Sequence, residues 1–234
     1  MGRKSSFLMA LDRVEQIENT TRGQVAAIRG FWREQQRKLA YEEAMRLEEA
    51  TEKMVLMARV LPAYTGCPFA EMEVQNTIAL SIPVEIGFTR ENWFGLRIPA
   101  LLPKKAAGSA SYIRSFLYPA MRQFFEKQPP VRYQNCVLVY RHVYDRERPE
   151  RRKRDHDNIE VNMVSDIVAM YVMPDDGPQI CSHYYCSAAG ALERTEVYVV
   201  PKEEFPAWLE KADKMPDEGV KLYEKQRIPG KKYM

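Results

Sequence analysis

The chain has 234 residues, of which 45% are hydrophobic and 29% are charged, and its formal net charge is +3. This composition is typical of a globular protein with one sizeable domain, or with one domain and a helical extension. No run of eighteen apolar residues occurs and the first residues lack the apolar core of a signal peptide, so we expect a cytoplasmic protein with no membrane partner. The net charge is too small to predict nucleic-acid binding by itself.

The first 62 residues carry apolar side chains at helical spacing. The pattern runs from about Phe7 to Leu61, weakens at Gly23 and Gly30, and ends at Pro62, which stops a helix. We therefore predict a helical hairpin as an extension over residues 1–62. Core-like spacing favours a packing or dimerisation role over nucleic-acid binding, because the Arg and Lys residues are matched by Glu.

A turn-rich segment follows, and residues 63–200 show the pattern of an α+β domain. Strands are predicted over five segments: Ile82–Phe88, Trp93–Ile98, Cys136–Tyr144, Gln179–Ser187 and Arg194–Val200. Helices are predicted over three segments: Ala70–Leu80, Ser111–Phe125 and Asn158–Val172. Residues 201–234 predict one short helix near Phe205–Ala212 and a loosely ordered tail.

Carboxylates gather around the helix expected over residues 158–172, which is apolar except for one polar stripe. Asp155 and Asp157 flank His156, so in an extended segment they share a face and could both reach one cation. The remaining polar groups are Asn158, Asn162 and Asp166 in the stripe, and Asp175 and Asp176 after the helix. Taken separately, Asp157 with Glu160 also matches a capping box, and Asp175-Asp176-Gly177-Pro178 matches a turn.

A basic loop precedes these carboxylates, and it allows two interpretations. It is either a solvated charged loop or a rim that grips phosphate, to which Lys104 and Lys105 could add. Acidic side chains inside a basic neighbourhood are what a Mg²⁺-dependent enzyme acting on a phosphodiester needs. The phosphate contacts expected from the loop come from Arg151, Arg152, Lys153 and Arg154.

The four cysteines, Cys67, Cys136, Cys181 and Cys186, are too few for a disulfide framework, and free thiols are the simplest interpretation. Cys181-x-His183-x-x-Cys186 suggests zinc only weakly. No second ligand pair lies at the usual spacing, and an extended strand would point Cys186 away from the other two.

The carboxylate pattern resembles that of RusA-type Holliday junction resolvases. The resemblance is carried by Asp155-His156-Asp157-Asn158, the later Asp166, and Asp175-Asp176 followed by Gln179-Ile180, and it covers about residues 82–200. It implies a mixed sheet with packed helices and a homodimer, often from phages or mobile elements. It also implies an endonuclease that acts on branched or duplex DNA with Mg²⁺, or Mn²⁺ in its place.

The resemblance also implies roles for particular residues. Asp155, Asp157 and Asp176 would be the catalytic metal ligands, with Asp175 as the alternative to Asp176, and Asn158, Asn162 and Asp166 would support them. Two departures from the family pattern matter. The position of a family lysine is occupied by Asn162, and Gly177-Pro178 adds one residue before Gln179. A catalytically inactive relative that binds DNA or serves in assembly is therefore the alternative.

Overall fold

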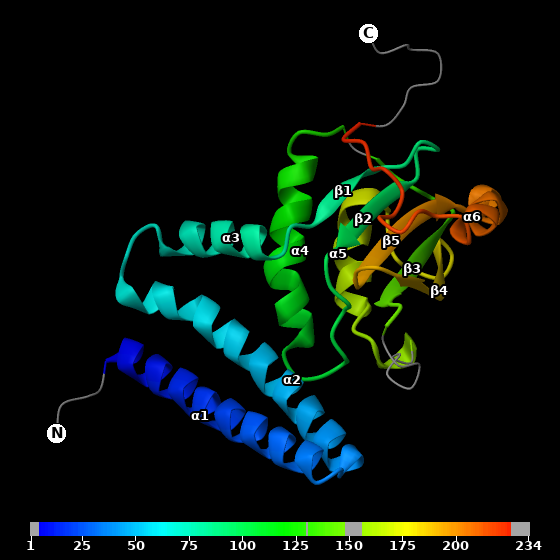
Figure 1. Cartoon of the computed structure of the whole chain (residues 1–234). Coiled ribbons are helices and arrows are strands. Elements are labelled where there is room, and N and C mark those ends of the chain that lie inside the picture. The colour runs from blue at the N-terminus through cyan, green and yellow to red at the C-terminus, as the bar shows by residue number, and fades with distance from the viewer. Residues whose placement is uncertain (1–4, 130, 148–155, 226–234) are drawn as a thin grey trace. The chain divides into compact units, whose positions relative to one another are not determined.

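The structure is a computed structural model that describes residues 5–129, 131–147 and 156–225 (Figure 1). It confirms the α+β class, with a five-stranded mixed sheet and helices. The chain divides into two compact units, Met1–Thr77 with Ala106–Tyr112 and Ile78–Lys105 with Ile113–Met234. Within the described residues, none of the helices combines the length and the apolar character needed to cross a membrane.

The first unit is built on two long helices, α1 (Ser6–Arg33) and α2 (Arg37–Val60), which lie side by side as a hairpin (Figure 1). The hydroxyl of Ser5 caps α1 by accepting a 3.3 Å hydrogen bond from the backbone N–H of Leu8. A short 3₁₀ helix, η1 (Leu61–Thr65), follows α2, and α3 (Ala70–Ser81) begins in this unit. The two helices predicted from the apolar spacing are therefore present.

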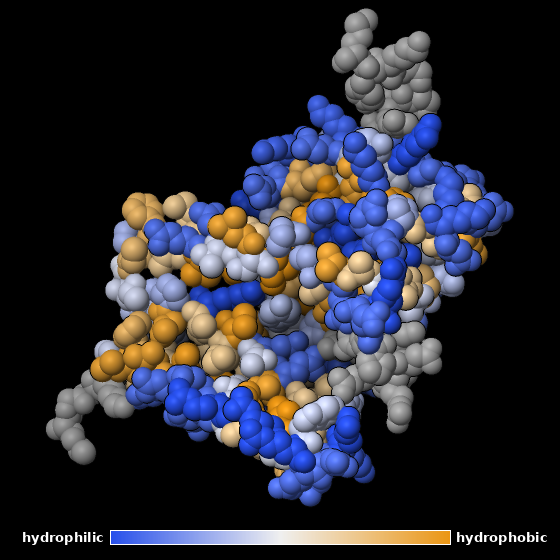
Figure 2. Space-filling model, in the orientation of Figure 1, coloured by the Kyte–Doolittle hydropathy of each residue, from blue (hydrophilic) through white to orange (hydrophobic). Residues whose placement is uncertain are grey.

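The hairpin buries little of its apolar surface. Thr21 is the one buried residue of α1, and Ala40 is the one buried residue of α2. Hydrophobic residues are interspersed with hydrophilic ones on the face of this unit that Figure 2 shows. The large apolar side chains that remain exposed on α1 and α2 are Leu8, Met9, Val25, Trp32, Leu39, Tyr41, Val55 and Val60.

The second unit is built on the sheet, whose strand order is β1-β2-β5-β3-β4. The strands are β1 (Glu85–Phe88), β2 (Phe94–Ile98), β3 (Cys136–Asp145), β4 (Cys181–Gly190) and β5 (Arg194–Pro201). β3 pairs with β4 in parallel, and the other neighbours are antiparallel. A parallel pair needs a crossover connection, and α5 (Asn162–Val172) lies in that connection. The five predicted strands are confirmed, with ends that shift by a few residues.

Strand side chains alternate between the two faces of the sheet, and helices cover both faces. On one face, the hydroxyl of Tyr140 lies 2.8 Å from the Ser165 hydroxyl of α5 and donates to the carbonyl of Val161 at 3.1 Å. The end of α4 (Ser109–Phe125) joins the same layer, since the rings of Phe125 and Tyr171 stack at 5.2 Å. On the other face, Trp208 of α6 (Phe205–Ala212) packs in a cluster with Val137, Val139, Tyr198 and Val200.

A buried ionic network lies on the α6 face. Glu196 of β5 is 0% exposed, and its carboxylate lies 2.9 Å from Arg141 Nη1 and 2.6 Å from Arg194 Nε. Gly219 closes over this network with a φ of +85°, and a Cβ there would lie 2.8 Å from the Glu196 carboxylate. Glycine is needed at this position both for the left-handed backbone and for the close approach.

The helix predicted to begin at Asn158 begins instead at Asn162, so the prediction was wrong at this end. His156–Asn158 forms a 3₁₀ turn, and Ile159 then makes an isolated β-bridge with Lys104. The N–H of Lys105 donates to the Asn158 carbonyl at 2.9 Å, and the Glu160 N–H donates to the Pro103 carbonyl at 2.9 Å. These backbone groups are committed to a distant segment, so they cannot start a helix.

The alternative interpretation of Asp157 and Glu160 as a capping box is wrong for the same reason. Asp157 lies in the 3₁₀ turn, and the N-cap of α5 is Val161. The carboxylate of the preceding Glu160 accepts a 3.3 Å hydrogen bond from the Met163 N–H in the first turn of the helix. At the carboxyl end of the described chain, Tyr223 exchanges two backbone hydrogen bonds with Phe88 of β1, at 2.8 and 2.9 Å. Residues 226–234 lie outside the described residues.

Candidate functional site

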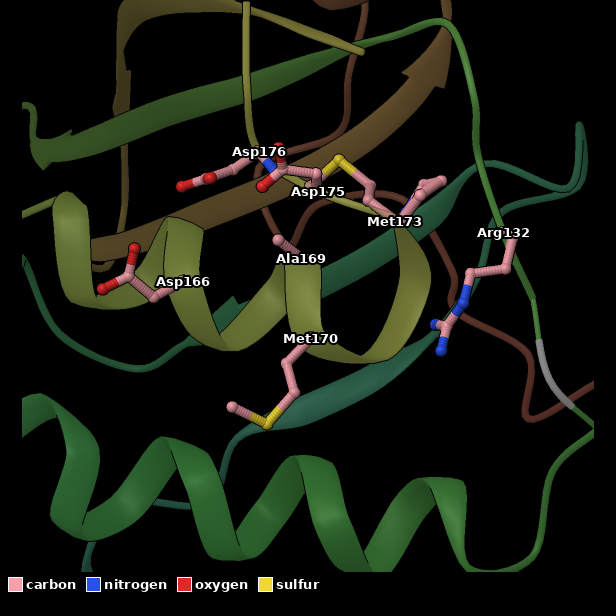
Figure 3. Close-up of a pocket in the computed structure, with 8 residues that line it drawn as sticks. Arg132, Asp166, Ala169, Met170, Met173, Asp175 and Asp176 are labelled. Carbon is pink, nitrogen blue, oxygen red and sulfur yellow. The ribbon is translucent and has the colours of Figure 1, made fainter.

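A cavity of about 350 Å³ opens beside α5, between that helix and the loop that leads to β4 (Figure 3). Three of the predicted carboxylates line it, one on the helix and two on the loop, and Arg132 lies at its other end. The lining residues are Arg132, Asp166, Ala169, Met170, Met173, Pro174, Asp175 and Asp176.

Asp166 and Asp176 are the two carboxylates that interact most directly. Figure 3 shows the Asp176 side chain extending toward Asp166. Partial burial raises the pKa of Asp166, and the charge of Asp176, the charge of Glu160 and a hydrogen bond with Asp176 raise it further. Two interacting carboxylates repel each other when both are ionised, so the pair favours a bound proton or a bound cation.

Asp175 is occupied by its own loop. Its carboxylate accepts a 2.9 Å hydrogen bond from the backbone N–H of Asp176, and it lies over Gly177, where a Cβ would come within 2.9 Å of it. The Gly177 carbonyl in turn accepts from the N–H groups of Ile180 and Cys181, both at 2.9 Å. The turn interpretation of this segment therefore holds for Asp175, while Asp176 is directed toward the helix.

His183 of β4 adds a titratable group beside Asp176. A hydrogen bond with Cys181 raises the pKa of His183 and burial opposes that rise, while the charges of Cys181 and Asp176 raise it further. Cys186 packs instead in the cluster around Trp208 on the opposite face. As the strand alternation predicted, Cys186 points away from Cys181 and His183, which interact with each other. Among the described residues, no group of three or more His, Cys, Asp or Glu side chains is arranged to hold a metal ion.

Asp157, a predicted metal ligand, is exposed on the 3₁₀ turn and does not line the cavity. Its neighbour His156 is the residue that lies on the sheet. The imidazole of His156 stacks on the rings of His142 and Tyr185, at 5.6 and 5.9 Å, and its Nε2 lies 3.0 Å from the Ser187 hydroxyl. No sequence pattern indicates this role, because the partners of His156 come from two separate segments of β3 and β4.

The other predicted residues fall into two groups. Asp155, Arg151, Arg152, Lys153 and Arg154 lie outside the described residues. Among the described ones, Asn162 is the exposed first residue of α5, and Asn158 accepts the Lys105 N–H through its carbonyl. Lys104 and Lys105 are thus placed beside the turn that holds Asp157.

Arg132 is a cavity residue that the sequence reasoning missed. Its guanidinium donates a 2.6 Å hydrogen bond from Nη1 to the Tyr171 carbonyl near the end of α5, and it lies across the cavity from the carboxylates (Figure 3). Because Arg132 belongs to the segment before β3, far from the acidic cluster along the chain, only the folded arrangement brings it to this cavity.

An α+β unit with a carboxylate-lined cavity beside a crossover helix is thus the class of protein that the fold and the site define. The chain matches the model of a family of unknown function (DUF6100) over residues 3–226, and it belongs to that family. A search of curated proteins and a search of solved structures each found no match.

Replacing Asp166 with asparagine is expected to stabilise the metal-free protein slightly at neutral pH. The raised pKa means that the protonated Asp166 favours folding at low pH and that this contribution is lost as the pH rises through the folded-state pKa. Solvent screens this partly exposed pair, so the gain should stay below about 1 kcal/mol. Urea unfolding measures this gain in stability at two pH values, one neutral and one below the ordinary aspartate pKa of 3.8. The gain should vanish at the lower pH. Asp157→Asn is the control. An equal gain in stability there would show that the gain in Asp166→Asn does not come from repulsion by Asp176.

Proposed function

We propose that this chain is a Mg²⁺-dependent, structure-specific DNA endonuclease similar to the RusA-type resolvases, acting on branched or duplex DNA as a homodimer. The observation that carries the proposal is the facing pair of Asp166 and Asp176 at the edge of a cavity of about 350 Å³. A divalent cation between two carboxylates would remove the repulsion that raises the pKa of Asp166.

The carboxylates at this cavity support the proposal of Mg²⁺. The ion prefers oxygen ligands and keeps several waters, so it commonly needs only one or two carboxylates from the protein. Asp166 comes from a helix and Asp176 from a loop whose backbone bonds fix it, so both ligands are held by ordered structure. We propose that Asp176 and Asp166 hold the ion, with Asp155 and Asp157 remaining predicted ligands. When bound, Mg²⁺ would supply an activated water and charge neutralisation at the phosphate.

Cations near the carboxylates would hold the DNA. Lys104 and Lys105 lie beside the 3₁₀ turn that holds Asp157. Arg132 lines the cavity, at the end away from Asp166 and Asp176 (Figure 3). Such side chains bind phosphate oxygens without reading base sequence, so they would position the strand. We propose that Arg132 supplies the positive charge that the family lysine, replaced here by Asn162, would otherwise provide.

The replacement of that lysine also supports a second candidate, a protein that keeps the fold and binds branched DNA without cutting it. Asn162 is an exposed, uncharged residue at the start of α5, so it cannot neutralise charge on a phosphate. In this candidate the basic side chains still contact DNA. The carboxylates would hold a cation that links the protein to a phosphate of the DNA without cleaving it.

Cleavage of labelled four-way junctions and matched linear duplexes tests the two candidates. With Mg²⁺ or Mn²⁺, the endonuclease should cut the junction at least about tenfold faster than the duplex, and EDTA should abolish the cutting. Salt-dependent binding without cleavage in any divalent metal would favour the second candidate. No binding to either DNA, even at low salt, would contradict both.

A further inference from the structure

Two buried free cysteines lie directly opposite each other on the parallel strands β3 and β4. Cys136 and Cys181 are register partners, and they are 1% and 4% exposed. Neighbouring strands are about 4.8 Å apart and opposite side chains share a face. This separation lies inside the range of about 4.4–6.8 Å that disulfide-bonded Cα atoms span. The backbone therefore already has the spacing that a cross-strand disulfide requires.

The two thiols differ in their surroundings. Cys136 Sγ lies 3.4 Å from Met173 Sδ, inside the layer between the sheet and α5. Cys181 is the first residue of an edge strand and is hydrogen-bonded to the exposed His183. A hydrogen bond with Cys136 has the largest effect and lowers the pKa of the Cys181 thiol, burial opposes this effect, and His183 adds to the lowering. The same hydrogen bond, together with burial, raises the pKa of Cys136. Of the two thiols, Cys181 is therefore the more readily ionised.

We propose that Cys136 and Cys181 are an oxidation site, a thiol pair that hydroperoxides convert into an intramolecular disulfide. The Cys181 thiolate attacks one oxygen of hydrogen peroxide and the O–O bond breaks, which gives a sulfenic acid and a hydroxide that takes up a proton to form water. The Cys136 sulfur then attacks the Cys181 sulfur and the S–O bond breaks, and the hydroxide leaves as water with the Cys136 proton. Two thiols and one peroxide become one disulfide and two waters.

The other two cysteines do not share these features. Cys186 points to the α6 face, where burial raises the pKa of its thiol to about 11. Cys67 is exposed, and it belongs to the other unit of the chain. Thiolates react with peroxide and thiols do not, so Cys181 should react first. This proposal is independent of the proposed nuclease function.

Intact mass and peptide mapping of the full chain test the pair. The reduced protein carrying Cys67→Ser, which prevents links between molecules, is treated with a slight excess of hydrogen peroxide and then alkylated. We expect the loss of two hydrogens, a crosslinked peptide pair that contains Cys136 and Cys181, and full reversal by dithiothreitol. Cys186→Ser should react at the same rate as its parent.

Two further variants separate the steps. Cys136→Ser should stop disulfide formation but leave a sulfenic acid at Cys181 that dimedone traps, and Cys181→Ser should slow peroxide consumption by about tenfold or more. Circular dichroism shows whether each variant is folded. If a variant does not fold, peptide mapping of the oxidised Cys67→Ser protein tests by itself whether Cys136 and Cys181 are the linked pair. Crosslinking of another pair, or oxidation of Cys186 before Cys181, would overturn the proposal.

Discussion

Asp176→Asn is expected to lower Mg²⁺-dependent cleavage of branched DNA by about a thousandfold. Asparagine keeps the size of the side chain but removes the charge that faces Asp166 across the cavity edge. With one of the two facing carboxylates gone, the cation would be held by Asp166 and by whatever Asp155 and Asp157 supply. Single-turnover rates on a four-way junction, at several Mg²⁺ concentrations, measure the loss.

Asp175→Asn is the matched control, because Asp175 is the adjacent residue in the same loop. Its carboxylate accepts the Asp176 N–H at 2.9 Å, and an asparagine oxygen can accept the same bond. We therefore expect this variant to retain most of the activity. A reversal, with Asp175→Asn inactive and Asp176→Asn active, would assign the metal to Asp175. Unchanged rates in both would show that neither carboxylate serves the reaction.

Glu196→Gln is expected to destabilise the second unit by about 3 kcal/mol or more, because it leaves two buried guanidinium groups without a counter-charge. Arg141 and Arg194 are 7% and 6% exposed, so water cannot solvate their charge in place of the carboxylate. Tyr198 also donates its hydroxyl proton to Glu196 at 2.9 Å. Urea unfolding at neutral pH measures the change. Glu126→Gln, which breaks an exposed pair with Arg122, should cost less than about 1 kcal/mol.

The Glu196 network also predicts a dependence on pH. Burial alone would raise the pKa of this carboxyl, but the charges of Arg141 and Arg194 and the bonds they make outweigh it and lower the pKa below 4.5. The ionised group therefore stabilises the fold above the unfolded-state pKa, and that stability is lost as the pH falls through the folded-state pKa. The difference between wild type and Glu196→Gln should shrink in acid. If the difference in unfolding free energy stayed constant from neutral to acidic pH, the destabilisation would come from packing and not from charge.

Local pattern was sufficient to predict the elements whose structure is decided locally. The alternation of Val137, Val139 and Val143 predicted β3, and the helical spacing before Pro62 predicted the hairpin. It failed at the start of α5, where the residues after Asp157 were read as helix. There the decision is made by a bridge between Ile159 and Lys104, a contact that the sequence around position 159 does not contain.

In the candidate site, too, local sequence pattern predicted some features, and others depend on tertiary structure. The sequence indicated which carboxylates to consider, but not that Asp166 and Asp176 would face each other while Asp157 lies on an exposed turn. Arg132 and the Cys136–Cys181 pair went unnoticed because each depends on how separate segments meet. Strand register and the path of a crossover are tertiary properties, so a motif search cannot supply them.

We propose that Asp166 and Asp176 together hold a divalent cation. Electron paramagnetic resonance of Mn²⁺ added to the full chain tests this claim without requiring DNA or turnover, because bound and free Mn²⁺ give different signals. We expect the wild-type protein to bind Mn²⁺, Asp166→Asn and Asp176→Asn each to weaken that binding by about tenfold or more, and Asp175→Asn to change it little. Equal Mn²⁺ affinity in wild type, Asp166→Asn and Asp176→Asn would contradict the claim.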